Sequence, residues 1–343
     1  MYNPRPIFQG KLNGSGVILI LFDFGIDLWN SVLHVSYSTK LSLTERLESE
    51  NMKPSLKLGI PKGSLQDATI DLFAQAGWQI NTRSRNYFPT IDDSEIQCSL
   101  VRSQEMGPYI ANGTIDAGLT GQDWIAETGA QVEVVSDLVY SKASDQPCRW
   151  VLVVKQDSDI HSIQDLQGKR IATELVDFTR RFMEQNGIDA QVDFSWGATE
   201  AKVVEGLADA AVEITETGST IKAHGLRIVC DLLHTHTVFV ANSEALEDPW
   251  KREKIQKIAL LLESALLARE KVLLKMNIPS DRLDGLVEYL PSLQAPTINS
   301  LYGGDWFAVE TVVSRGDVRD IIPTLKSLGA EGILEFELRK MVK

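Results

Sequence analysis

The stretch that decides the fold is Glu213-Ile-Thr-Glu-Thr-Gly-Ser-Thr220, which follows the short apolar run Ala210-Ala-Val212. Such a run is typical of a buried strand, and the residues from Thr220 to Leu226 have helical character. Between them, Gly218 allows a ligand to approach the backbone closely, and hydroxyl side chains flank it. An ordinary strand–turn–helix connection capped by Thr or Ser has the same pattern, so this loop alone does not define a function.

The loop combines a phosphate-binding pattern with a carboxylate suited to a sugar. Backbone N–H groups at the start of a helix lack intrahelical partners and carry partial positive charge, so a phosphate can occupy that position. Glu213 lies just upstream, where its carboxylate can accept hydrogen bonds from the vicinal hydroxyls of a ribose. The stretch therefore indicates a phosphate beside a ribose.

Strand and helix patterns alternate on either side of this loop. Leu56–Ile60 and Val151–Val154 are apolar runs typical of strands. A helix is predicted from Ser64 to Gly77, with Ser64 as its N-cap and Asp67 in the capping-box position. Alternating strands and helices predict parallel βαβ units, in which ligands bind beyond the carboxyl ends of the strands.

Further motifs keep a fixed order along the chain. They are Gly59-Ile-Pro-Lys-Gly-Ser-Leu65, Arg83-Ser-Arg85-Asn-Tyr87, Leu100-Val-Arg102-Ser-Gln-Glu105, Gly113-Thr-Ile-Asp-Ala-Gly118-Leu-Thr-Gly121-Gln-Asp123, Arg170-Ile-Ala-Thr173 and Gly197-Ala-Thr-Glu200. With the loop at Glu213, this ordered set resembles ATP phosphoribosyltransferase, the family that performs the first step of histidine biosynthesis. The resemblance runs from about Leu56 to the C-terminus.

The resemblance implies an α/β fold with a two-lobed catalytic core like type II periplasmic binding proteins. We place lobe I at residues 52–148 and 234–265, and lobe II at residues 149–233. Residues 266–343 show a βαββαβ order, which is ferredoxin-like, with Gly303-Gly304 as a hairpin turn. In the long form of the family this domain binds histidine and regulates the enzyme. A domain that only assembles subunits is the alternative, because fold alone does not specify function.

The family joins N1 of ATP to the anomeric carbon of phosphoribosyl pyrophosphate and releases pyrophosphate. The resemblance implies catalysis by positioning and electrostatics, without a protein nucleophile. It places the 5′-phosphate on Thr217, Gly218, Ser219 and Thr220, the ribose hydroxyls on Glu200 and Glu213, and ATP or pyrophosphate on Lys62, Gly63, Ser64, Arg83 and Arg102. Mg²⁺ would be held mainly by substrate oxygens. Without the resemblance, each of these cations is equally well explained as a solvated surface charge.

Several positions depart from the family's pattern or carry no assigned chemistry. Glu213 stands where Asp is common, which keeps the charge but lengthens the side chain. Glu174-Leu-Val176 stands where many members have a Tyr-Pro pair, so the role of that pair is not transferred. His224 replaces a common Asn, while Gly118 and Gly121 are expected only to form tight turns.

Composition narrows the possible functions. The chain has 343 residues, 43% of them apolar, and a formal charge of −13, so it is globular and is not predicted to bind nucleic acid. The apolar run 17–33 contains Asp23 and Asp27, which makes a membrane span costly. Residues 1–51 do not fit the family, and we expect the natural protein to start at Met52.

Cysteine and histidine spacing gives no strong metal or disulfide signal. Cys98, Cys148 and Cys230 lack CxxC spacing, so we predict reduced, mostly buried thiols in a cytoplasmic protein. His234 and His236 share a strand face and could bind a transition metal. Because no third ligand lies nearby in sequence, half-exposed strand positions explain the pair better.

Three alternatives to an ATP phosphoribosyltransferase stay open at this point. A two-lobed small-molecule binding or regulatory protein without turnover would use the same fold. A different phosphoribosyltransferase would share the Thr-Gly loop, and an inactive paralogue would share most motifs. The predicted partners are ATP, phosphoribosyl pyrophosphate and histidine as inhibitor, with assembly into a homo-oligomer between a dimer and a hexamer.

Overall fold

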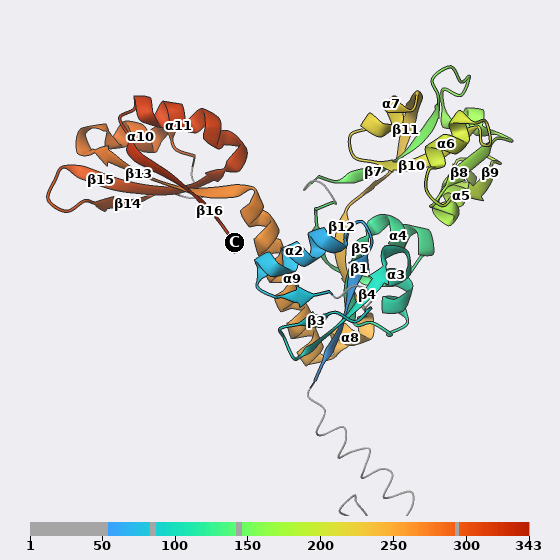
Figure 1. The fold of residues 1–343 in the computed structure, drawn as a ribbon, viewed down its shortest axis with the longest axis horizontal. Helices are drawn as coiled ribbons and strands as arrows, with labels where there is room; N and C mark the ends of the chain where they lie inside the picture. The colour runs from blue at the N-terminus through green and yellow to red at the C-terminus, as the bar shows by residue number, and fades with distance from the viewer. Residues whose placement is uncertain (1–53, 83–86, 142–145, 292–294, 343) are drawn as a thin grey trace, which may run out of the picture. The chain divides into compact units, whose positions relative to one another are not determined.

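The computed structural model describes residues 54–82, 87–141, 146–291 and 295–342 (Figure 1). The predicted leader at residues 1–51 and the predicted site residue Arg83 lie outside the described residues, as does Arg85. None of the helices within those ranges is long and apolar enough to span a membrane. Three sheets of four or five strands organise the described chain.

The first sheet combines parallel strands with one strand that returns from later in the sequence. Its strand order is β4 (Ile96–Arg102), β1 (Leu56–Lys62), β5 (Ala117–Gly121), β12 (Thr237–Ala241) and β6 (Glu133–Leu138). Strand β1 pairs in parallel with β4 and β5, whereas β12 runs antiparallel to β5 and β6. Strand β12 therefore pairs with two strands, β5 and β6, that lie more than ninety residues earlier in the sequence.

Helices cover this sheet through a continuous apolar core. They are α2 (Gln66–Ala76), α3 (Ser103–Ala111), α4 (Gln122–Thr128), α8 (Ser243–Glu247) and α9 (Pro249–Arg269). Along α9, Ile255, Ile258, Leu262 and Ala265 are fully buried, and this three- and four-residue spacing forms one helical face. The Asp248 side chain caps α9 by accepting hydrogen bonds from the first backbone N–H groups.

The second sheet carries the three parallel strands that lead to the predicted site. Its strand order is β11 (Leu226–Thr235), β7 (Cys148–Lys155), β10 (Ala210–Thr215), β8 (Arg170–Thr173) and β9 (Gln191–Phe194). Strand β8 lies between β10 and β9 and is parallel to both, so the carboxyl ends of these three strands share one edge. Its helices are α5 (Val176–Gln185), α6 (Thr199–Val204) and α7 (Ser219–Ala223).

The third sheet confirms the ferredoxin-like order predicted for the C-terminal part. Strands β14 (Thr297–Ser300), β15 (Trp306–Ser314), β13 (Lys271–Pro279) and β16 (Glu331–Glu337) lie in that order, with every neighbouring pair antiparallel. Helices α10 (Leu283–Tyr289) and α11 (Val318–Ser327) cover one face (Figure 1). The Leu301 N–H donates to the Trp306 carbonyl at 2.8 Å, which closes the predicted hairpin around Gly303.

Two local predictions about the first lobe are wrong. Ser64 does not cap α2: the helix starts at Gln66 without a side-chain cap, because a turn closed by Gln66 N–H and the Gly63 carbonyl precedes it. Gly118 lies inside strand β5 and not in a turn, and a Cβ there would lie 2.7 Å from Met106 Sδ. Gly121 ends a strand, and a Cβ would collide with the Asp123 carboxylate. Both glycines serve close packing.

The points where the chain passes from one sheet to the next lie close to the predicted domain boundaries, and the boundaries themselves stay a prediction. The chain enters the second sheet at Cys148 and leaves it after Thr235, so His236 links β11 to β12. Helix α9 ends at Arg269, and the third sheet begins at Lys271.

The three cysteines are free thiols in the structure. Cys98 is buried, and burial raises its pKa to about 12. Cys148 and Cys230 are half-buried. Among the described residues no cluster of three or more His, Cys, Asp or Glu side chains is arranged to hold a metal ion.

Candidate active site

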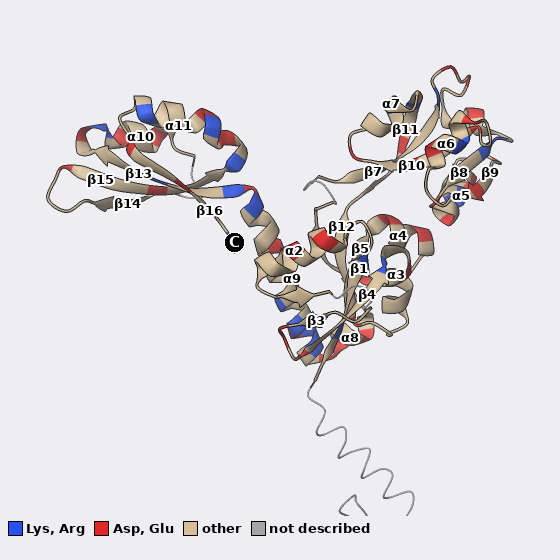
Figure 2. Ribbon diagram, viewed as in Figure 1, with Lys and Arg blue, Asp and Glu red and all other residues tan. Residues whose placement is uncertain are grey.

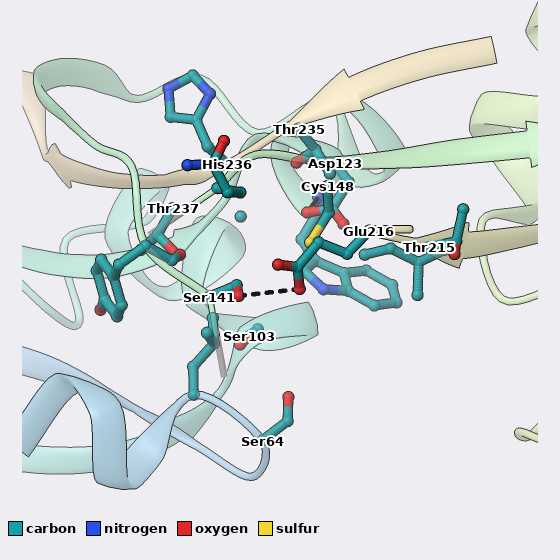
Figure 3. Close-up of a pocket in the computed structure, with 16 residues that line it drawn as sticks. Ser64, Ser103, Asp123, Ser141, Cys148, Thr215, Glu216, Thr235, His236 and Thr237 are labelled. Carbon is teal, nitrogen blue, oxygen red and sulfur yellow. Dashed lines mark hydrogen bonds between the residues drawn. The ribbon is translucent and has the colours of Figure 1, made fainter. Parts of the chain in front are cut away.

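A pocket of about 360 Å³ is lined by residues of both α/β lobes (Figure 3). From the first lobe come Ser64 and Leu65, which precede α2, together with Ser103, Gly121, Asp123, Trp124, Tyr140 and Ser141. The second lobe contributes Cys148, Ile214, Thr215 and Glu216. The hydroxyl of Ser141 donates a hydrogen bond to Glu216 Oε2 at 3.4 Å across this pocket (Figure 3).

A second pocket, of about 240 Å³, brings together the residues predicted to bind phosphoribosyl pyrophosphate. Its lining contains Glu200, Glu213, Thr217, Ser219 and Thr220. It shares Ile214, Thr215 and Glu216 with the first pocket, so the two cavities adjoin along β10 and the loop that follows it.

The loop after β10 is shaped by its own hydroxyl groups. The Gly218 N–H donates to Thr215 Oγ1 at 2.8 Å, and the Thr217 hydroxyl donates to Ser219 Oγ at 3.0 Å. Gly218 has a φ of +76°, a left-handed conformation that disfavours other residues. Helix α7 has only five residues, so the exposed hydroxyls contribute more to an anion site here than the helix dipole does.

The predicted ribose carboxylates form one electrostatic group. Burial, together with the negative charge of the neighbouring Glu200, raises the pKa of Glu213 to about 7, although a hydrogen bond from Thr199 opposes the shift. Glu174, at a position where the chain departs from the family pattern, contributes in the same direction. Burial also raises the pKa of Glu174. The carboxyl group of Glu213 therefore lies near its titration point at neutral pH.

Replacing Glu213 with Gln should change how stability depends on pH. The ordinary pKa is 4.5, so the folded chain binds this proton more tightly than the unfolded chain does. The contribution of Glu213 to stability is therefore lost as pH rises from about 4.5 to about 7. At about pH 8 we expect Glu213→Gln to exceed the wild type in unfolding free energy by about 3 kcal/mol. At about pH 4 the two proteins should be nearly equal.

Denaturant unfolding at both pH values measures this difference, with the exposed Glu205→Gln as the matched control. An equal gap between Glu213→Gln and wild type at both pH values would contradict the raised pKa.

Two of the predicted phosphate-binding cations, Lys62 and Arg102, are among the described residues, and both lie outside the two pocket linings. Lys62 and Arg102 are register partners at the carboxyl ends of the parallel strands β1 and β4. The ammonium group of Lys62 lies 3.8 Å from the centroid of the Tyr87 ring. Gly63, with a φ of +119°, turns the chain from β1 so that Ser64 reaches the first pocket.

Sequence reasoning assigned no role to Asp123, although it ends one of the motifs. This carboxylate is buried, and its Oδ2 accepts the indole N–H of Trp150 at 2.8 Å. The Asp123 N–H donates to Thr235 Oγ1 at 3.1 Å. Burial raises the pKa of Asp123, and the Trp150 hydrogen bond opposes that shift. Because Trp150 lies on β7, Asp123 ties the first lobe to the second beside the pocket.

Glu127 makes a second link between the lobes. Its two carboxylate oxygens accept the backbone N–H groups of Asp177 and Phe178, at 3.0 and 2.7 Å. These N–H groups lie in the first turn of α5, where a carboxylate also complements the helix dipole. A sequence pattern could not show this cap, because it comes from a residue about fifty positions away.

Trp196 was also not singled out from the sequence. Its side chain is 82% exposed and packs edge-to-face on Phe194, with ring centroids 4.8 Å apart. It follows β9 at the same sheet edge as Glu174 and the loop after β10, and Ala198 after it has a φ of +47°. The one sequence feature that could have drawn attention to Trp196 is its position directly before the motif that begins at Gly197.

Fold and pockets together define a class: a two-lobed α/β protein with two adjoining pockets lined by acidic and hydroxyl side chains, and a ferredoxin-like C-terminal domain. Residues 102–264 match the family model described as ATP phosphoribosyltransferase, and residues 268–340 match the one described as HisG, C-terminal domain. The chain belongs to the ATP phosphoribosyltransferase family.

Individual relatives agree with this assignment. The chain is 57% identical over 291 residues to ATP phosphoribosyltransferase of Desulfatibacillum aliphaticivorans, covering 85% of this chain and 100% of the relative. It is 58% identical over 287 residues to that of Solidesulfovibrio magneticus, with 84% and 98% covered. The solved ATP phosphoribosyl transferase (HisG:HisZ) complex from Thermotoga maritima matches with a TM-score of 0.54 and 27% identity, covering 62% of this chain and 98% of that one.

These relationships confirm the predicted family and reaction class. The chain is a transferase of the first step of histidine biosynthesis, and the alternative of a binding protein without turnover is not favoured.

Proposed function

We propose that this chain joins N1 of ATP to C1 of phosphoribosyl pyrophosphate in the two adjoining pockets. The observation that best supports this proposal is the lining of the second pocket. There, the carboxylates of Glu200 and Glu213 share one cavity with the hydroxyls of Thr217, Ser219 and Thr220. A 5′-phosphoribosyl group needs hydroxyl and N–H donors at one end and acceptors for its ribose hydroxyls at the other. This pocket offers both within one loop and its neighbouring helix.

ATP would then occupy the first pocket, with its base directed towards the shared residues Ile214–Glu216. Reaction at the anomeric carbon develops positive charge on the ribose ring, which the carboxylates of Glu200 and Glu213 stabilise. The hydroxyls of Ser64 and Ser103 line the first-lobe side of this pocket. Lys62 and Arg102, at the adjacent strand ends, attract the triphosphate or the leaving pyrophosphate.

The residues fit Mg²⁺ carried by the substrates rather than held by the protein alone. Carboxylate oxygens are suitable ligands, yet the described residues form no three-ligand cluster, and Mg²⁺ commonly binds through substrate phosphates plus one or two carboxylates. Bound in this way, it would neutralise charge on the pyrophosphate group.

Incubation of the purified chain with ATP, phosphoribosyl pyrophosphate and Mg²⁺ tests the proposal. We expect phosphoribosyl-ATP and pyrophosphate in equal amounts, and no product when Mg²⁺ is chelated. Folded protein that forms no product would contradict the assignment and favour an inactive paralogue.

We also propose that histidine inhibits the enzyme through residues after Glu270. Support comes from the C-terminal family match and from the ferredoxin-like sheet. Deleting these residues should abolish inhibition by histidine while leaving a folded catalytic core, since the first two sheets contain no strand from beyond residue 241. Initial rates with and without histidine measure this, and inhibition that persists in the truncated protein would place the effector site elsewhere.

We further propose a homo-oligomer assembled through the open face of the third sheet. Leu334 and Phe336 are 50% and 45% exposed and pair with Lys275 and Leu273, on the face opposite the buried Val272 and Leu274. Exposed apolar side chains on one sheet face are typical of a subunit contact. Light scattering of the wild type and of Phe336→Glu tests it: the variant should form smaller assemblies.

A further inference from the structure

A third cavity, of about 480 Å³, lies apart from both pockets. It is lined by Gln75 of α2, Arg269 at the end of α9, and Arg315, Glu337, Leu338 and Arg339 of the C-terminal part. Three guanidinium groups against one carboxylate give this lining a net charge of +2, in a chain whose formal charge is −13. Figure 2 shows Lys and Arg positions gathered where α9 runs into β13.

Protein hydrogen bonds hold these guanidinium groups in place. Arg315 Nε donates to the Arg269 carbonyl at 3.1 Å, and Arg339 Nη2 donates to the Ala74 carbonyl at 3.2 Å. Arg269 Nε donates to Gln75 Oε1 at 2.9 Å. Each guanidinium has five N–H donors, so Arg315 and Arg339 keep further donors beyond these anchoring bonds. Arginines fixed in this way lose little entropy when they bind a planar or tetrahedral oxyanion.

The carboxylate of Glu337 is a weak counter-charge for this cluster. It contacts Arg315 Nη1 at 3.2 Å, but its side chain is 81% exposed. Ion pairs at such exposure are weak because water and salt screen both charges. A ligand with two or more negative charges can therefore displace Glu337 from Arg315.

We propose that this cavity is an anion-binding site for a phosphate-bearing ligand with at least two negative charges. Guanidinium forks match phosphate oxygens with paired, charge-assisted hydrogen bonds, and the net charge of +2 favours a group that carries two negative charges. The ligand would contact α2, α9 and the C-terminal residues together. Gln75 lies at the C-terminal end of α2, and the N-terminal end of the same helix follows Ser64 and Leu65, which line the first pocket.

Titration calorimetry of the full chain with pyrophosphate tests the site. Pyrophosphate should also bind the proposed catalytic pockets, so we expect two classes of site per chain. Arg315→Gln combined with Arg339→Gln should weaken one class by about 100-fold, since each lost guanidinium contact accounts for about 1.5 kcal/mol. Arg319→Gln, an exposed arginine of α11 outside the cavity, should leave both classes unchanged.

Thr217→Ala combined with Thr220→Ala should weaken only the other class, so failure of the proposed catalytic site and failure of this cavity give different results. Adding AMP or ATP in place of pyrophosphate shows whether a nucleotide or a free phosphate compound is the better ligand. Arg315 and Arg339 also donate hydrogen bonds to backbone carbonyls, so replacing them could weaken binding by disturbing the structure. A variant that is expected to strengthen pyrophosphate binding therefore provides an independent check. Glu337→Gln leaves those hydrogen bonds intact and should tighten pyrophosphate binding about 3-fold by removing the competing carboxylate.

Two results would overturn the proposal. One is unchanged pyrophosphate binding in the folded double arginine variant. The other is a Glu337→Gln protein that binds pyrophosphate no more tightly than the wild type, which would leave the arginines a purely structural role at the ends of α2 and α9.

Discussion

Thr217→Ala combined with Thr220→Ala lowers kcat/KM for phosphoribosyl pyrophosphate by about 100-fold, as the expected result of losing two donors to a charged phosphate. Each hydrogen bond to a charged group contributes about 1.5–3 kcal/mol, and about 1.4 kcal/mol corresponds to a factor of ten. Both hydroxyls are exposed into the second pocket, so they are available to a ligand. Steady-state kinetics with varied phosphoribosyl pyrophosphate at saturating ATP measures the change.

The effect should be specific for that substrate and that loop. The KM for ATP should change little, and Thr297→Ala, an exposed threonine of β14, should behave as the wild type. Unchanged kinetics in the double variant would contradict the assignment of the loop. Because the Thr217 hydroxyl also contacts Ser219, circular dichroism and the thermal midpoint should be compared first.

Asp123→Ala should lower the free energy of unfolding by about 3 kcal/mol and reduce turnover. The substitution leaves the indole N–H of Trp150 buried without its acceptor, and removing one partner of a buried charged hydrogen bond costs about 1.5–3 kcal/mol or more. It also loosens the contact between α4 and β7, whose residues line the first pocket. Denaturant unfolding followed by tryptophan fluorescence measures the loss.

A double-mutant cycle separates this hydrogen bond from general packing. Asp123→Asn keeps a carbonyl acceptor and should cost less than Asp123→Ala, while Trp150→Phe removes the donor. If the Asp123–Trp150 hydrogen bond carries the effect, the losses of unfolding free energy caused by Asp123→Ala and by Trp150→Phe should be non-additive by about 1 kcal/mol or more. Additive losses would show that the bond contributes nothing of its own.

Much of the fold could be predicted from periodicity because its strands and helices have regular patterns. In β13 every second residue is buried, and in α9 the buried residues follow three- and four-residue spacing. These periods fix the ferredoxin-like order and the long helix without knowledge of tertiary contacts. The start of α2 was not predictable in this way, because Ser64 and Asp67 fit a capping box while the backbone turn at Gly63 sets the helix start instead.

The candidate site was partly predictable for a similar reason. Glu213 and Thr217–Thr220 are contiguous, so a sequence motif can contain them, and the second pocket unites them with Glu200. Asp123 with Trp150, and Glu127 with α5, are pairs from distant segments whose meaning depends on how the lobes pack. The prediction of turns at the two glycines of β5 was wrong. A glycine that is required because a side chain would not fit cannot be distinguished, from sequence alone, from a glycine that is required for a positive φ.

The placement of β12 has a consequence for how the chain acquires its structure. Strands β5 and β6 cannot complete their hydrogen bonds until residues 237–241 have been synthesised, whereas the second sheet is built from the uninterrupted segment 148–235. On the ribosome the inserted lobe can therefore fold first, while the first lobe keeps unpaired strand edges exposed. Slow translation or mutation within the insert should thus cause aggregation through the first lobe, which lies earlier in the sequence yet finishes later.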